Sequence, residues 1–216
     1  MWVATAVARM RKIFYLSTKV VRTFMKSEAP SAWSMVGMLA VSVYMTLRHM
    51  TLRRPSIPAL LITLSAAIHV PHSFRYHINY KRNDRRRLFY QDVKYMFVGH
   101  AILHSALSYN IPLCIACFTA PMYYFITSDI LRNIPYTSMQ ELQKKYAISR
   151  SWIFLLHYIP IYITTGSYTY VLGHFGLFSF MLGVYLALNN PLGNFLMHCG
   201  LILNTVFAHL LVAHFI

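Results

Sequence analysis

The sequence predicts an all-α integral membrane protein, in which an N-terminal amphipathic interfacial helix precedes five or six short membrane helices, some of them kinked or re-entrant. Three observations lead to this fold class. Of the 216 residues, 57% are hydrophobic and only 12% are charged, whereas soluble domains devote about a quarter of their residues to charge. No charged residue occurs from Ser151 to Ile216. Lys and Arg number 20 against 5 acids, and they gather between the apolar runs.

Residues 1–27 form the first predicted element, a basic amphipathic surface helix. They contain six basic residues and no acid. At about 100° per residue, the basic side chains gather on one side of a helix and Val, Met and Phe on the other. This pattern is typical of a mitochondrial presequence and also of a helix lying on an anionic bilayer. We expect a retained surface helix that also serves as an import signal.

Residues 33–72 are predicted to form a short helical hairpin. They hold two apolar runs, 33–47 and 56–72, which a basic turn separates. The first run would reach only about 22 Å as a helix, short of the roughly 30 Å hydrocarbon core. We therefore expect snorkelling side chains, a thinned bilayer or neighbouring protein at the helix ends.

Residues 75–94 form a basic interfacial segment with only two acids, Asp84 and Asp92. Clusters of Lys and Arg beside a membrane helix bind anionic headgroups, at about 1 kcal/mol for each residue near the surface. The sequence therefore predicts a site for cardiolipin or another anionic phospholipid. A topogenic signal without a specific ligand is the alternative, and nucleic acid is disfavoured because the cluster lies between membrane spans. The predicted headgroup ligands are Arg75, Lys81, Arg82, Arg85, Arg86, Arg87 and Lys94.

The second half of the chain contains the remaining predicted elements. Residues 95–127 would extend about 50 Å as one straight helix, so they must kink near 110–112, continue beyond the bilayer, or fold back as a re-entrant pair. Residues 128–150 are a polar connector. Residues 151–216 are predicted to form a charge-free C-terminal helical bundle, with breaks at 173–176 and 189–191. Folding back would place most basic residues on one side, which the positive-inside rule assigns to the matrix or cytoplasm.

All five acids lie outside the apolar runs, and this placement disfavours several functions. Proton pathways through membranes usually need an intramembrane carboxylate or a paired charge. An autonomous proton pump, a proton-coupled transporter and catalysis by paired carboxylates are therefore disfavoured. We expect no enzyme activity. The acids are Glu28, Asp84, Asp92, Asp129 and Glu141.

The chain has eleven histidines, which are the main candidates for a cofactor site. A haem b needs one histidine on each of two facing helices, so His100 or His104 could face His157 or His198. The alternative is that these side chains hydrogen-bond to neighbouring helices or lie at headgroup level. The histidine boxes are incomplete for di-iron chemistry, and the single CxxC lacks the second pair of a zinc site. We therefore expect no metal and no cofactor, with haem b as the alternative.

Residues 140–211 include QELQKKYAISRSW and, before the last predicted helix, NNPLG. This third of the chain resembles a small domain of unknown function found in mitochondrial inner-membrane proteins. More broadly, the basic N-terminus, scarce acids and abundant Tyr and Phe resemble nuclear-encoded accessory membrane subunits of oxidative phosphorylation complexes. The resemblance implies a non-catalytic multi-pass subunit of the ATP synthase membrane region or of a respiratory chain complex. Its location would be the mitochondrial inner membrane, with the basic segments toward the matrix.

In that setting, the expected partners are other membrane subunits and anionic lipids, with bound cardiolipin and no nucleic acid. The alternative function is a haem b-binding subunit of an electron-transfer complex.

Overall fold

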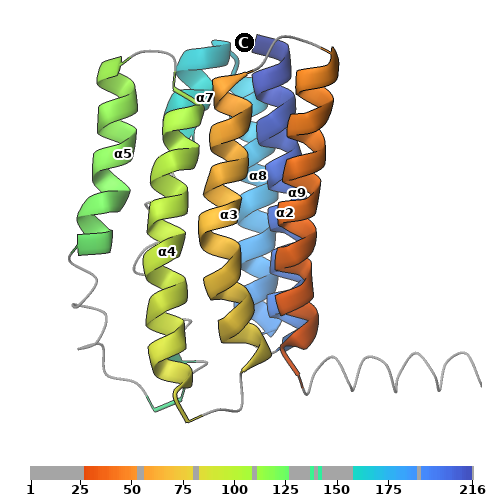
Figure 1. The fold of residues 1–216 in the computed structure, drawn as a ribbon, viewed down its shortest axis with the longest axis vertical. Helices are drawn as coiled ribbons and strands as arrows, with labels where there is room; N and C mark the ends of the chain where they lie inside the picture. The colour runs from red at the N-terminus through yellow and green to blue at the C-terminus, as the bar shows by residue number, and fades with distance from the viewer. Residues whose placement is uncertain are drawn as a thin grey trace, which may run out of the picture.

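The computed structural model describes residues 27–52, 56–79, 83–108, 111–126, 137–138, 141–142, 158–188 and 191–215. Within these ranges the protein is all-helical, as predicted, and contains no strand. Residues 1–26 of the predicted surface helix, most of the connector at 128–150, and His157 lie outside the described residues. The longer helices run side by side along one axis (Figure 1). They are α2 (Ala29–Leu52), α3 (Ile57–Ile78), α4 (Arg85–Ala106), α5 (Ile111–Ile126), α7 (Tyr158–Thr165), α8 (Tyr168–Leu188) and α9 (Pro191–Phe215).

Three of these helices, α2, α3 and α9, are long and apolar enough to cross a membrane. The prediction of short spans at 33–72 is wrong, because α2 has 24 residues and α3 has 22. At 1.5 Å per residue, both exceed the roughly 30 Å hydrocarbon core. Each helix continues through polar residues beyond its apolar run, to Leu52 in α2 and to Ile78 in α3. Pro71 lies inside α3 without ending it.

Residues 95–127 fold back, which is one of the three predicted alternatives. Helix α4 ends at Ala106, and α5 begins at Ile111 and returns alongside α4 (Figure 1). Pro112 is the second residue of α5, a position where a missing backbone N–H removes no helical hydrogen bond. The basic segment predicted at 75–94 is divided between the last turn of α3 and the first turns of α4.

The C-terminal region differs from prediction at one break and agrees at the other. Helix α8 runs without interruption through Gly173, so the break predicted at 173–176 is wrong. The chain turns earlier, at Gly166, whose φ of 59° is a left-handed conformation that glycine adopts without strain. The Gly166 N–H donates to the Tyr162 carbonyl at 2.8 Å and ends α7. The break predicted at 189–191 is confirmed, since α9 begins at Pro191.

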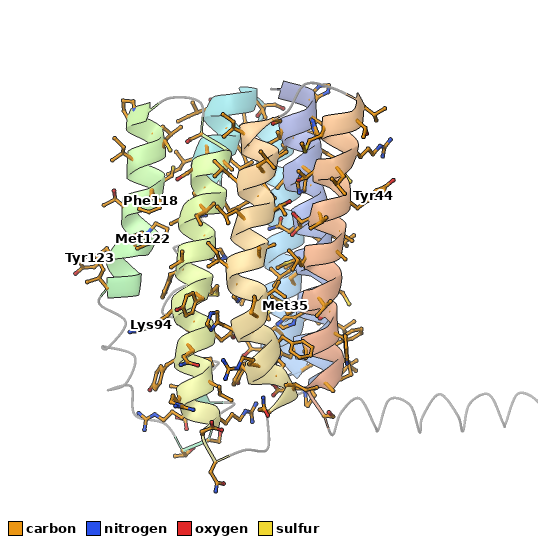
Figure 2. All side chains as sticks on the ribbon, in the orientation of Figure 1. Met35, Tyr44, Lys94, Phe118, Met122 and Tyr123 are labelled. Atoms are coloured by element: carbon orange, nitrogen blue, oxygen red, sulfur yellow. The ribbon has the colours of Figure 1, made fainter. Side chains whose placement is uncertain are left out.

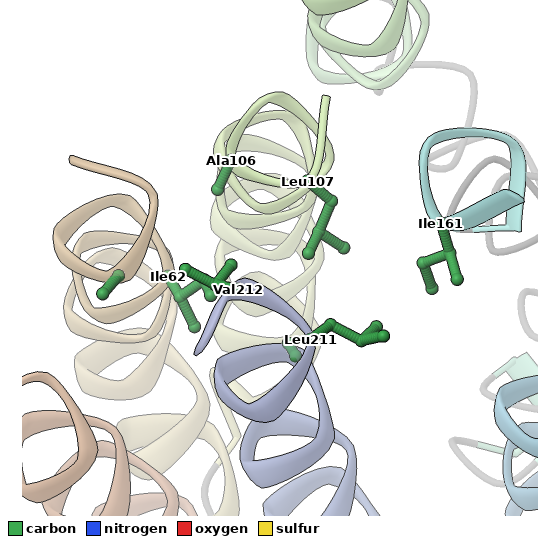
Figure 3. Packing of buried hydrophobic residues seen from close by; sticks show 8 residues of the cluster. Ile62, Ala106, Leu107, Ile161, Leu211 and Val212 are labelled. Carbon is green, nitrogen blue, oxygen red and sulfur yellow. The ribbon is translucent and has the colours of Figure 1, made fainter. Parts of the chain in front are cut away.

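Apolar packing holds the helices together at two levels. One cluster joins α3, α4, α7 and α9 through Ile62, Ala106, Leu107, Ile161, Leu211 and Val212 (Figure 3). A second cluster, Met35, Met38, Ala66 and Val70, packs α2 against α3 with Leu201 and Ile202 of α9 beside it. Between α3 and α4 the backbones approach closely at Gly99, where an added Cβ would lie 3.1 Å from the Ser65 carbonyl oxygen. The Ser65 hydroxyl donates to the Gly99 carbonyl at 2.7 Å.

The outer faces of the bundle are apolar. Tyr44 on α2 and Tyr123 on α5 point away from the other helices, whereas Met35 lies inside (Figure 2). These outward faces suit contact with lipid or with other membrane helices. Other large exposed apolar side chains include Trp33, Leu47, Leu52, Ile115, Ile126, Leu172, Phe180, Leu203 and Leu210.

Candidate functional site

The basic residues in the described part of the chain gather at one end of the bundle. Helices α2, α4 and α9 begin at this end and α3 finishes there (Figure 1); we call it the basic end. Lys94 lies nearer this end than the other (Figure 2). Among the described residues, Arg48 is the one Lys or Arg near the opposite end. The basic residues toward the basic end are Arg75, Arg85, Arg86, Arg87 and Lys94.

A buried carboxylate ties three helices together at the basic end. Glu28, immediately before α2, is only 5% exposed. One carboxylate oxygen accepts a hydrogen bond from Arg85 Nη2 at the start of α4, and the other lies 2.8 Å from His77 Nδ1 in the last turn of α3. The Arg85 guanidinium also lies over the Tyr76 ring, 5.4 Å from its centroid. Glu28 lies outside the apolar runs, as the sequence indicates, but it is buried by the packing of the three helices.

The charge of Arg85 is retained in this setting. Burial alone would lower the pKa of Arg85, but Tyr76 and Glu28 together outweigh burial and raise the pKa above its ordinary value. Arg85 therefore stays charged, and it faces Glu28 as a cation.

Helix α9 adds two polar side chains to this group. Asn194 Nδ2 lies 3.4 Å from His77 Nδ1. His198 Nδ1 donates to the backbone carbonyl of Ser31 on α2 at 3.0 Å, because a carbonyl can only accept. The rings of His77 and His198 meet edge to face, with centroids 4.6 Å apart. Residues of α2, α3, α4 and α9 thus converge around one carboxylate and two imidazoles.

A second carboxylate–histidine pair lies farther from the basic end, between α3 and α4. Asp92 Oδ1 is 3.0 Å from His69 Nε2, and the two side chains are 14% and 15% exposed. Burial alone would raise the pKa of Asp92, but the hydrogen bond from His69 and the nearby histidines outweigh it and lower the pKa. Asp92 is therefore ionised at neutral pH. One helical turn from His69, the His72 ring stacks on Tyr95 of α4 with centroids 3.5 Å apart.

A third polar group lies deeper in the bundle, between α2, α3 and α9. The Ser42 hydroxyl is 2.9 Å from both the Thr63 hydroxyl and His209 Nε2. The Thr46 hydroxyl is 2.8 Å from that of Thr63 and donates to the Ala59 carbonyl at 3.0 Å. Sequence reasoning missed this group because small hydroxyl residues count as part of an apolar run. The spacing of Ser42 and Thr46, which places them on one helix face, is the signal that identifies them.

The predicted headgroup ligands fall into different positions. Arg85 faces inward to Glu28, which makes it a structural cation rather than a surface one. Arg75, Arg86 and Arg87 are exposed at the basic end, and Lys94 is half-buried. Arg87 pairs with Asp84 at 3.2 Å. Lys81 and Arg82 lie outside the described residues.

Arg86 is held on its own helix by an aromatic neighbour. Its Nε donates to the Tyr90 hydroxyl at 3.2 Å, and its guanidinium lies 5.5 Å from the Tyr90 ring centroid. Lipid binding by this set stays a prediction.

The predicted haem ligands are not brought together. His104 is fully buried about 28 Å along α4 from the basic end, with the His100 ring stacked beside it on the same helix. His198 lies against His77 in the last turn of α3, with ring centroids 4.6 Å apart. His100 follows Gly99, which contacts Ser65 about 18 Å earlier along α3. His198 therefore lies at a different level of the bundle from His100 and His104, and His157 lies outside the described residues.

No group of three or more His, Cys, Asp or Glu is arranged to hold a metal ion in the part of the chain that the structure describes. Cys114 and Cys117 of the CxxC are free thiols. No protein-family model, curated protein or solved structure matches this chain.

Proposed function

We propose that this chain is a non-catalytic, multi-pass accessory subunit of a large mitochondrial inner-membrane complex, belonging to the ATP synthase membrane region or the respiratory chain. Its role is to scaffold neighbouring membrane helices and to hold cardiolipin or another anionic phospholipid at the basic end. The observation that carries this proposal is the arrangement of the bundle, whose outward faces are apolar and whose described cations gather at one end. The mitochondrial setting rests on the sequence resemblance and on the basic N-terminal segment.

The basic end has the chemistry that a phospholipid headgroup needs. Arg75, Arg86 and Arg87 are exposed there, and guanidinium groups match phosphate oxygens through paired N–H donors. The Tyr90 contact holds Arg86 against its own helix, so less side-chain freedom is lost when a phosphate binds. The buried Glu28 neutralises Arg85 and so leaves the exposed cations as the surface charge. By the positive-inside rule, this end faces the matrix.

The outward apolar faces support the scaffolding role. Trp33 on α2 and Phe180 on α8 are exposed by more than half of their surface. A monomeric soluble protein rarely exposes so many large apolar side chains in contiguous patches. In a membrane assembly such faces contact acyl chains and other subunits.

Native electrophoresis of mildly solubilised mitochondrial membranes, followed by mass spectrometry of the co-migrating proteins, tests the assembly. We expect this chain in a band with oxidative phosphorylation subunits, and migration as a 25.1 kDa monomer or small oligomer would contradict the proposal. Lipid bound to the purified complex tests the basic end separately. Replacing Arg75, Arg86 and Arg87 together by Gln should reduce bound cardiolipin, while Arg48→Gln at the opposite end should not.

A further inference from the structure

Two cations and a tyrosine of α4 lie in one row at the basic end. Arg86, Tyr90 and Lys94 are spaced four residues apart, so they follow a single ridge of the helix; we call them the α4 row. We propose that this row binds a phospholipid whose two phosphates are linked in one headgroup, as in cardiolipin. This inference rests on the proposed headgroup role of the basic end, and it specifies both the ligand and the residues that select it.

Lys94 projects toward the end of α5. In Figure 2 its side chain leaves α4 on the side of α5, below Met122 and Tyr123 in that view. Helices α4 and α5 meet at the opposite end of the bundle, and α5 has 16 residues against 22 in α4. At 1.5 Å per residue, the first turns of α4 therefore extend about 9 Å beyond the last residue of α5. Arg86 lies on this extension, and Lys94 lies near the level at which α5 ends.

The contacts of Arg86 differ from those of its neighbours in sequence. Arg85 pairs with the buried Glu28, and Arg87 pairs with Asp84 at 3.2 Å. Arg86 Nε instead donates to the neutral Tyr90 hydroxyl at 3.2 Å, and its guanidinium lies 5.5 Å from the ring centroid. This contact holds the side chain on the ridge without cancelling its charge. The α4 row therefore presents positive charge at two levels of one helix.

The separation of these charges suits two phosphates on one molecule. Arg86 and Lys94 lie about 12 Å apart along α4, and both side chains are long enough to reach toward the turn between them. A guanidinium binds phosphate oxygens through paired N–H donors, and an ammonium binds them as a compact charge. The Tyr90 hydroxyl accepts from Arg86, and a hydroxyl that accepts can also donate its own proton to a phosphate oxygen.

The link between the two phosphates gives the α4 row its selectivity. Once Arg86 holds one phosphate, the second is confined near Lys94 and binds as an intramolecular group. Two separate lipids with one phosphate each would lose translational freedom twice for the same contacts. A lipid with two linked phosphates should therefore bind about tenfold or more tightly than the same number of phosphates on separate lipids.

The surface beside the α4 row suits the acyl chains of the same lipid. Phe118, Tyr123 and Ile126 of α5 are exposed, and α5 runs from the level of Lys94 to the opposite end of the bundle. A lipid with its phosphates at the row would direct its chains along this apolar face toward the bilayer centre. The headgroup and the chains thus both meet matching surfaces.

The test is competition binding to the purified full chain in neutral detergent micelles, with fluorescently labelled cardiolipin as the probe. Unlabelled cardiolipin and phosphatidylglycerol displace the probe, and their affinities are compared per phosphate. We expect the unaltered chain to favour cardiolipin about tenfold or more. Lys94→Gln and Arg86→Gln should each bring the two affinities near equality. Arg75→Gln is the control, because it removes a cation of the same end on α3 and should weaken both lipids alike, so that the preference is kept.

Three results would overturn the two-phosphate site. They are equal affinities for the two lipids in the unaltered chain, an undiminished preference in either α4-row variant, and a loss of preference in Arg75→Gln equal to that in the row variants. Circular dichroism shows that each variant keeps its helices; if Lys94→Gln does not, Arg86→Gln, whose side chain is exposed, is the row variant compared. Equal binding of both lipids rejects only this site, whereas no binding of the probe to the unaltered chain also contradicts the headgroup role of the basic end.

Discussion

Replacing Glu28 by Gln removes the charge that joins α2, α3 and α4 while keeping the size of the side chain. Arg85 would keep Tyr76, at 3.4 Å from its hydroxyl, but would lose its anion. Breaking a fully buried ion pair from one side costs about 3–5 kcal/mol. Because the Arg85 side chain is 14% exposed at the end of a helix, water or headgroups partly screen it. We therefore expect the variant to lose about 2–4 kcal/mol of unfolding free energy.

The assay is reversible unfolding in mixed detergent micelles, followed by circular dichroism, in a double-mutant cycle of Glu28→Gln and Arg85→Gln. If the pair acts as a unit, the double variant should lose less than the sum of the two single losses. Arg87→Gln is the control, because the Arg87 side chain is 70% exposed and its pair with Asp84 should contribute under about 1 kcal/mol. Equal losses for Glu28→Gln and Arg87→Gln, or an additive cycle, would refute the reasoning.

Three further predictions concern packing, the hydroxyl group and pH. Gly99→Ala should destabilise the protein by about 1–3 kcal/mol, because its Cβ meets a backbone oxygen of α3. Gly173→Ala should be neutral or stabilising, because an added Cβ there meets nothing within 4 Å. Thermal unfolding of both variants checks this. Ser42→Ala should cost about 1–3 kcal/mol by leaving a buried imidazole nitrogen without its partner. Thr119→Ala, which removes an exposed hydroxyl bonded within its own helix, should cost clearly less. The pKa of Asp92 is lower in the folded protein than its ordinary value of 3.8. The ionised Asp92 therefore contributes its full stabilisation above pH 3.8, and this contribution disappears as the pH falls through the pKa that Asp92 has in the folded protein. The stability difference between the unaltered chain and Asp92→Asn should therefore shrink below about pH 4, and a difference that grows toward acid would contradict this assignment.

The helical class and the position of the last helix could be predicted because they depend on local pattern. The NNPLG sequence inside the long charge-free stretch is sufficient to locate the start of α9 near Pro191. The ends of α2 and α3 could not be predicted from apolar runs, because a helix continues as long as its backbone hydrogen bonds do, through polar residues such as His49 and Arg75.

The candidate site was harder to predict because its contacts are distant in sequence. Glu28 meets His77 and Arg85 only after three helices have packed, so its position before an apolar run does not indicate these contacts. Asp92 was assigned to an interfacial segment because of its basic neighbours in sequence, although α4 turns it toward His69. The histidine pairs proposed for haem share suitable residue types, but residue type does not specify the level of each side chain along the bundle.

The Glu28 carboxylate also has a consequence for the order in which the chain is assembled. Its cation, Arg85, follows both α2 and α3 in the chain and is therefore synthesised after them. Until α4 is made, the carboxylate before α2 lacks its guanidinium partner. The pairing with Arg85 then fixes three helix ends in a single event. Variants at Arg85 should therefore reduce the amount of correctly inserted chain, as well as the stability of chains already folded.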